Sequence, residues 1–156
     1  ANRIGCSSMT TDTQIEKEIQ AKGLTAPRIT PADIEANIAS EHYFTARDGR
    51  SGAIDNDSYV GRESPAKGNA DLVPLDLLTF CVLVLRNGFT VTGESACASP
   101  ENFDAEIGRK IARQNAVAKI WPLLGYELKS RLQELDLATQ AINHLAGLMD
   151  QTESKK

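Results

Sequence analysis

The 156-residue sequence has few of the side chains that hold metals or build disulfide frameworks. Its three cysteines, Cys6, Cys81 and Cys97, are widely spaced and odd in number, so they indicate neither a CxxC pair nor a disulfide framework. Its two histidines, His42 and His144, lie far apart in the chain. We therefore expect no zinc site, no Cys–His nucleophile pair and no cofactor.

Long apolar runs and an excess of basic residues are missing as well. No run approaches the roughly 20 apolar residues of a membrane span, and the N-terminus has no signal-peptide core. We therefore expect a soluble, intracellular protein without a membrane partner. The 17 Lys and Arg residues against 21 Asp and Glu give a net charge of −4, which argues against DNA or RNA polymers as partners. A small anionic ligand in a local basic pocket is compatible with this charge.

The residues that are present are typical of one globular domain. Hydrophobic residues make up 41% of the chain and charged residues 24%. The length favours a single domain over residues 9–150. Residues 1–8 show no periodicity and are interpreted as a tag or an extended start, and residues 151–156 form a polar tail.

The N-terminal third predicts two short helices, a strand and a long loop. The first helix covers residues 11–23, and the second begins after Thr30, a good N-cap that is followed by proline. Residues 41–47 are aromatic and β-branched, which indicates a strand. Residues 48–74 are rich in Gly, Asp, Asn and Ser and show no sustained period. Such a long loop is either functional or disordered, and disorder is the favoured interpretation.

The clearest local signal is a β-hairpin centred on Asn87-Gly88, which predicts a two-residue turn. That turn pairs Val84 with Val91. The face predicted to accept a helix then comprises Phe80, Val82, Val84, Arg86, Phe89, Val91, Gly93 and Ser95. The opposite, half-polar face comprises Cys81, Leu83, Leu85, Thr90, Thr92 and Glu94. Its leucines and cysteine also need cover, so a subunit contact is expected there.

The segment "SPENFDAEIGRKIARQNAVAKIW" predicts a long helix with Ser99 as N-cap and Pro100 in its first turn. Its expected buried stripe is Phe103, Ile107, Ile111, Val117, Ala118 and Trp121. Pro122 and Gly125 should interrupt it. A last helix over 127–149 carries apolar residues at three- and four-residue steps, which suits core or coiled-coil packing between subunits. The fold class predicted from all these elements is α+β, with an antiparallel sheet and long C-terminal helices.

The corner between hairpin and helix is a candidate anion site. A helix N-terminus presents free backbone N–H groups to phosphate or carboxylate. The residues expected there are Ser95, Ser99 and Asn102 as hydrogen-bonding groups, Arg109 and Arg113 as cations, and Phe89 or Phe103 as stacking rings. The alternative is purely structural: Ser99 and Asn102 cap the helix, Phe103 is core, and Arg109 pairs with Glu106.

Catalysis has less support. Glu94, Glu101, Asp104 and Glu106 lie near one corner, but nothing pairs them with a nucleophile or a metal. No P-loop, GxGxxG, HExxH or GxSxG motif is present. We therefore expect a binding protein and not an enzyme.

The run "LTFCVLVLRNGFTVTGESACASPENFDAEIGRKIARQNAVAKIWPLLGYELKSRL", together with "DIEANIASEHYFTA", resembles a family of small phage proteins of unknown function. Its motifs "NGF", "ES-C--P-NFD--IG" and "KIW---GY-L" also resemble the core of the phage anti-Thoeris sponge proteins of the first type. The resemblance covers about residues 28–132, so the loop over 48–74 departs from the pattern and the tail beyond Leu132 lies outside it.

This resemblance implies a homo-oligomeric inhibitor of bacterial defence that acts in the host cytoplasm. Sponges of that type bind glycocyclic ADP-ribose in pockets between two subunits, and related ones hold cyclic oligonucleotide signals of the cGAS-like (CBASS) system. The matching positions are Phe89, Ser95, Asn102, Phe103, Asp104 and Arg109. Two alternatives are a phage inhibitor that binds a host protein and a hydrolase of such signals.

Overall fold

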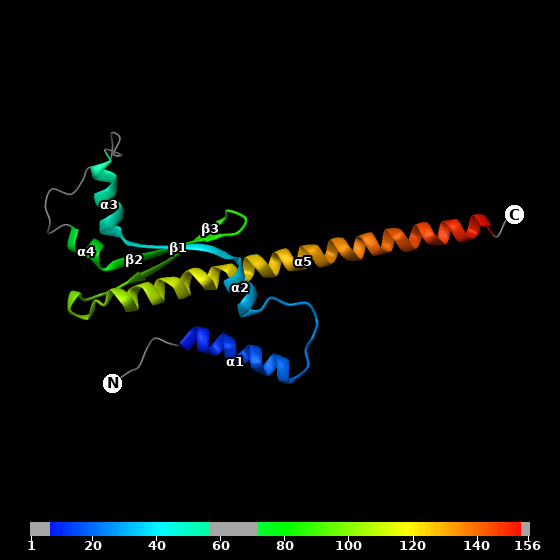
Figure 1. The fold of residues 1–156 in the computed structure, drawn as a ribbon, viewed down its shortest axis with the longest axis horizontal. Helices are drawn as coiled ribbons and strands as arrows, with labels where there is room; N and C mark the ends of the chain where they lie inside the picture. Colours follow the sequence, from blue (N-terminus) through cyan, green and yellow to red (C-terminus); the bar gives the residue numbers. More distant parts are fainter. Residues whose placement is uncertain (1–6, 57–71, 154–156) are drawn as a thin grey trace.

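The structure, a computed structural model, describes residues 7–56 and 72–153. Its helices are α1 (Ser7–Ala21), α2 (Pro31–Asn37), α3 (Ala46–Asp55), α4 (Val73–Asp76) and α5 (Ala105–Glu153), with a 3₁₀ turn over Pro100–Asn102. The strands β1 (Ile38–Thr45), β2 (Leu78–Leu85) and β3 (Thr90–Ala96) form one antiparallel sheet in the order β1-β2-β3. The predicted α+β class is confirmed. Figure 1 shows α5 running along the sheet and then projecting far beyond it.

Reciprocal capping fixes where the short helices begin. At α2, the Thr30 hydroxyl accepts from the backbone N of Asp33 at 3.2 Å, and the Asp33 carboxylate accepts from the backbone N of Thr30 at 2.8 Å. The predicted N-cap is therefore confirmed. Thr45 and Asp48 form the same capping box at the start of α3.

The ends of three predicted segments are corrected by these helices. Residues 48–55 belong to α3, so the predicted loop is wrong there, while residues 57–71 lie outside the described part of the chain. The glycines of α3 lower its helix propensity, so the sequence pattern did not indicate this helix, which its capping box stabilises. Helix α1 begins at Ser7, inside the predicted non-periodic start, and ends at Ala21. Strand β1 begins at Ile38, directly after α2, and not at residue 41.

The hairpin exists where expected, but its predicted register is wrong by one residue. The backbone N of Leu85 donates to the carbonyl O of Phe89 at 2.8 Å, so the loop has three residues and Gly88 takes the left-handed conformation with φ of +84°. Leu83 therefore pairs with Val91. Because side chains alternate along a strand, this one-residue slip exchanges the two faces of β2.

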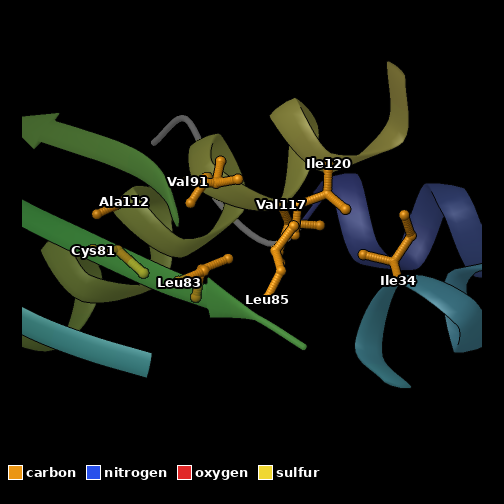
Figure 2. Packing of buried hydrophobic residues seen from close by; sticks show 9 residues of the cluster. Ile34, Cys81, Leu83, Leu85, Val91, Ala112, Val117 and Ile120 are labelled. Atoms are coloured by element: carbon orange, nitrogen blue, oxygen red, sulfur yellow. The ribbon is translucent and has the colours of Figure 1, made fainter. Parts of the chain in front are cut away.

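The face of β2 that meets α5 is therefore the one predicted to be half polar. Cys81, Leu83 and Leu85 are buried against α5, whereas Val82 and Val84 lie on the outer face with Thr90 and Thr92 of β3. Figure 2 shows these buried side chains between the sheet and the helix. The buried apolar residues are Ile34, Cys81, Leu83, Leu85, Val91, Ala112, Ala116, Val117 and Ile120. Cys81 is a free thiol that serves as a small core residue, so α5 of the same chain and not a second subunit covers it.

Small residues let α5 lie very close to β3. A Cβ atom added to Gly93 would come within 2.1 Å of the Ala112 carbonyl O and 2.3 Å of the Ala116 backbone N. The contact stripe of α5 therefore contains Ala112, Ala116 and Ile120, whereas the predicted stripe residue Ile107 is exposed. The sequence pattern favoured large apolar residues, but a close backbone approach requires small ones.

The C-terminal helix differs from its predicted form at two places. It begins at Ala105, because the residues after Ser99 form a separate 3₁₀ turn. It also continues through Pro122 and Gly125 to Glu153, so the predicted interruption is wrong. Ala118, whose carbonyl loses its helical partner at Pro122, is exposed. Buried Ile120 and half-buried Leu124 flank Pro122, and their packing holds both sides in one helix.

Two side chains of α5 cover the free edge of the sheet. Asn115 donates to the carbonyl O of Glu94 at 2.8 Å, and Lys119 donates to the carbonyl O of Thr92 at 2.7 Å. These contacts satisfy edge groups of β3 that could otherwise pair with another strand. No helix within the described residues is long and apolar enough to cross a membrane.

Candidate functional site

The predicted anion site at the corner is already occupied by a side chain of the protein. The Asp104 Oδ1 atom accepts from the backbone N of Glu106 at 2.8 Å and from that of Ile107 at 2.9 Å. Asp104 is therefore the N-terminal cap of α5, and Ser99 is not. A carboxylate in this position satisfies the free donors and repels a second anion. The helix start offers no vacant phosphate cradle.

The other corner residues serve the backbone turn around them. The carbonyl O of Ser99 accepts from the backbone N of Asn102 at 3.1 Å, and its hydroxyl makes no capping bond. Asn102 is exposed, and Phe103 is half-buried at the end of the 3₁₀ turn. Ser95 lies half-buried on β3, opposite Thr79. These residues lie together at one end of the sheet.

Arg113 is held by two carboxylates from other elements. Its Nη2 donates to Glu35 of α2 and to Glu41 of β1, at 2.7 Å each, and its Nε donates to Glu41 at 3.0 Å. Tyr43 adds a hydroxyl that donates to Glu41 at 2.5 Å. This cluster fastens α5 to α2 and β1. It is a structural ion-pair network.

The same contacts set the protonation of these groups. The hydrogen bond from Arg113 lowers the pKa of Glu41, and the two glutamates raise the pKa of the Arg113 guanidinium, Glu41 most strongly. Burial, followed by the bond to Glu41, raises the pKa of Tyr43. Because Arg113 forms ion pairs with both Glu35 and Glu41, its charge is already partnered within the chain. The expectation that Arg109 and Arg113 reach one anion is therefore not supported by these contacts.

Arg109 has the opposite environment. It is exposed, one turn before Arg113, and makes no hydrogen bond or ion pair within the described residues. Glu106, its expected partner, bonds Lys110 at 2.7 Å instead. Arg109 thus remains a cation that is available to a ligand.

The opposite end of the sheet does have a hollow, which we call the hairpin-end cleft. It consists of two adjoining cavities of about 350 and 240 Å³ that share Asn37, Leu124 and Glu127 as lining residues. Helix α2, the turn between β2 and β3, and α5 form its walls. Arg86 and Arg131 line the larger cavity, and Phe89 lines the smaller one.

The charged side chains that line the cleft differ in whether they already bond another group of the chain. Arg131 bonds Glu127 one turn before it, and Asp33 is engaged in the capping box of α2. The side chain of Arg86 is exposed and has no hydrogen-bonded partner among the residues that the structure describes. Phe89 is 55% exposed beside the hairpin turn, so its ring can contact a ligand. Arg86 and Phe89 are the groups of the cleft with unused binding capacity.

The predicted site residues therefore fall into two separate groups. Phe89 directly precedes β3 at the hairpin turn, whereas Ser95 and the other predicted residues, Ser99, Asn102, Phe103 and Asp104, lie at or after the end of β3. Figure 1 shows the segment between β3 and α5 at the opposite end of the sheet from the hairpin turn. Strand β3 separates the two ends by about 20 Å. Phe89 and the corner residues cannot contact one small ligand within a single subunit.

Sequence reasoning missed Arg86 and Asn37. Arg86 directly precedes the Asn87-Gly88 signal, so its position at an exposed hairpin tip could have been noticed. The backbone N of Arg86 donates to the carbonyl O of Asn37 at 2.9 Å, which brings the end of α2 beside the turn. No sequence pattern links two residues so far apart.

A further hollow of about 230 Å³ lies between α1, α2 and α5. Ile34, Val117 and Trp121 give it a mainly apolar lining. No group of three or more His, Cys, Asp or Glu side chains in the described ranges could hold a metal ion.

Comparison with known proteins assigns the chain to a protein family. The model of the phage protein family described by N4 Gp49 and phage Sf6 gene 66 matches residues 29–132. The chain belongs to this family. Searches of curated proteins and of solved structures gave no match. The residues named for the cleft and the corner all lie within the matched range of this phage protein, whereas α1 and the end of α5 lie outside it.

Proposed function

We propose that this phage protein binds and sequesters a nucleotide-derived immune signal of the bacterial host without cleaving it. The ligand would be glycocyclic ADP-ribose or a cyclic oligonucleotide, as the resemblance to the phage sponge proteins implies. Such signals are free in the host cytoplasm, where the protein would act. The proposed site is the hairpin-end cleft.

One observation carries the proposal: the exposed ring of Phe89 and the exposed cation of Arg86, which has no partner within residues 7–56 and 72–153, line adjoining cavities. Phe89 can stack on a base, and Arg86 can contact a phosphate, since these are the contacts that nucleotides make with aromatic and arginine side chains. Taken together, the adjoining cavities of about 350 and 240 Å³ reach the size of small-molecule sites, which is roughly 300–1,000 Å³. Asn37 adds amide hydrogen-bonding groups to both.

Sequestration is preferred to hydrolysis because the sequence contains no recognised catalytic motif. The corner remains a secondary binding candidate through Arg109, the exposed cation at the other end of the sheet. In an oligomer, a corner from one subunit and a cleft from another can both contribute to a shared pocket.

Ligand binding tests this proposal directly. The purified protein is titrated calorimetrically with glycocyclic ADP-ribose and with cyclic di- and trinucleotides, and thermal shifts are recorded in parallel. After heat denaturation, chromatography of the released ligand should show the intact molecule, because a hydrolase would leave a cleaved product. Absence of binding to every one of these ligands would reject the function for this ligand set.

Two matched variants locate the site. Arg86→Ala and Phe89→Ala should each weaken binding by about fivefold or more, since each removes a contact worth at least about 1 kcal/mol. Arg109→Ala is the control, because it removes an exposed arginine at the other end of the sheet. If Arg109→Ala weakens binding and the cleft variants do not, the site is the corner.

A protein-binding inhibitor is the second candidate, and the outer face of the sheet favours it. Phe44 and Phe80 lie there with ring centroids 5.6 Å apart, next to half-buried Val82 and Val84. Such an open apolar strip suits contact with another protein. Val82→Glu should leave ligand affinity unchanged. If it abolishes anti-defence activity while the ligand still binds, the protein-binding role is supported.

A further inference from the structure

The second half of α5 exposes apolar residues over a long distance. With 49 residues, α5 is about 74 Å long, and every described side chain from Gln133 to Met149 is exposed. Those residues include Leu135, Leu137, Ile142, Leu145, Leu148 and Met149. From Leu137 to Met149 the sequence contains no Asp, Glu, Lys or Arg. A solvated helix normally carries charges on its exposed face, so this composition indicates a helix that is covered by a partner.

The apolar residues follow a seven-residue repeat. Leu128, Leu135, Ile142 and Met149 are each seven positions apart, and Leu132, Thr139 and Ala146 lie between them at the alternating steps of three and four that a coiled coil requires. Thr139 is the polar residue of this seam. It can be buried there, because its hydroxyl already donates to the carbonyl O of Leu135 at 2.8 Å.

We infer that this segment, residues 128–149, pairs with the same segment of a second copy in a parallel, two-stranded coiled coil. A helix with one repeating seam is self-complementary, so an identical chain presents a matching surface. Most helical stability in proteins comes from packing of an apolar face and not from intrinsic propensity, so pairing would stabilise this segment. The segment lies mostly beyond the family match at residues 29–132. Leu128 and Arg131 at its start also line the hairpin-end cleft, whereas the seam from Leu135 onward lies outside it.

Charge favours the parallel orientation. In this repeat, with Leu128 and Leu135 at d, Arg131 takes position g and Asp136 takes position e of the next heptad. These positions meet across a parallel pair, so each Arg131 would face Asp136 of the other chain, twice in the dimer. In an antiparallel pair the charged turns over 127–136 would lie against the uncharged turns of the partner.

Molar mass in solution tests the pairing. Sedimentation equilibrium of the full chain should give twice the 16.9 kDa of one chain. Leu135→Lys should weaken the dimer by about 100-fold or more, because two buried leucines are lost. The matched control is Leu137→Lys, which makes the same change two residues away at position f. The exposed fractions of Leu135 and Leu137 in the single chain, 64% and 58%, are similar, so only the seam distinguishes them.

A charge exchange tests the orientation. Arg131→Asp and Asp136→Arg should each weaken the dimer by about threefold to tenfold, and the double exchange should restore affinity. Far-UV circular dichroism confirms that each variant folds. A monomeric wild-type chain at 100 μM, or an equal loss from Leu135→Lys and Leu137→Lys, would overturn the coiled coil. A trimer would overturn the two-stranded state, and a dimer without rescue by the double exchange would overturn the parallel register.

Discussion

The two halves of α5 differ in what their side chains meet. In the first half, Ala112, Ala116 and Ile120 are buried against the sheet, and Arg113, Asn115 and Lys119 bond the strands or α2. In the second half, large apolar residues are exposed from Leu135 to Met149. The first half uses small residues to approach a strand, whereas the second uses large ones at heptad spacing. One continuous helix therefore combines an intramolecular surface with a surface suited to another chain.

The largest expected effect breaks the close contact of the first half. Gly93→Ala should lower the free energy of unfolding by more than about 4 kcal/mol, because its methyl group would lie 2.1 Å from the Ala112 carbonyl O. Urea unfolding followed by the fluorescence of Trp121, the single tryptophan, measures it. Gly147→Ala is the control, since nothing lies within 4 Å of the added methyl. A neutral Gly93→Ala would contradict the close approach.

The same substitution at two isoleucines compares the two halves of α5 directly. Ile120→Ala should cost about 2–5 kcal/mol of unfolding free energy, because it leaves a cavity in the core. Ile142→Ala should change the same quantity by less than about 0.5 kcal/mol at concentrations where the chain is monomeric. Both are measured by the Trp121 signal. Equal losses would show that the second half is packed within one chain.

The two arginines of the first half should differ as well. Arg113→Ala should cost about 1–3 kcal/mol, because Glu35 and Glu41 lose their shared cation and face each other. Arg109→Ala should stay within about 0.5 kcal/mol, since its side chain is exposed. Arg113→Lys should rescue only part of the loss, because an ammonium cannot bond both carboxylates in the same planar geometry. If Arg109→Ala lowers the free energy of unfolding as much as Arg113→Ala does, the ion pairs of Arg113 are not what stabilises the fold.

The smallest expected effect is on the free energy of unfolding at acid pH. The pKa of Glu41 is lowered in the folded state from its usual 4.5 by the hydrogen bond from Arg113. Its contribution to stability is therefore complete above pH 4.5 and is lost as pH falls through the lowered pKa. The pKa values of Asp33 and Asp48 are lowered too, through bonds from Thr30 and Thr45.

Glu41→Gln isolates the part that belongs to this cluster. Compared with the wild type, it should show a shallower loss of unfolding free energy below pH 4.5, by less than the cost of Arg113→Ala. Denaturant unfolding at several pH values between 3 and 7 measures the difference in slope. Parallel curves for the two proteins would mean that Glu41 titrates normally.

Local signals in the sequence were sufficient for several elements. Thr30 and Asp33 cap α2 through bonds between residues three positions apart, and Asn87-Gly88 marks the hairpin. The heptad leucines of the last helix are equally local. The α+β class follows from such elements taken together.

The candidate site was much less predictable. Arg113 has a spacing that suits an anion site, yet its partners Glu41 and Glu35 lie 72 and 78 positions away. Ser99 and Asp104 are both good capping residues, and the structure uses Asp104. The hairpin-end cleft depends on α2 lying beside the turn at Arg86, which no short-range pattern expresses.

The sequence by itself determined which segments become helices and strands, wherever caps and turns act within four residues. The tertiary structure decided the hairpin register and the buried face, because burying Cys81, Leu83 and Leu85 on the same face as Val91 and Gly93 outweighs the preference for a two-residue turn. The tertiary structure also keeps α5 continuous through Pro122, since packing on both sides of the proline offsets the lost backbone hydrogen bond. Turn and cap preferences are worth about 1 kcal/mol each, and core burial is worth more.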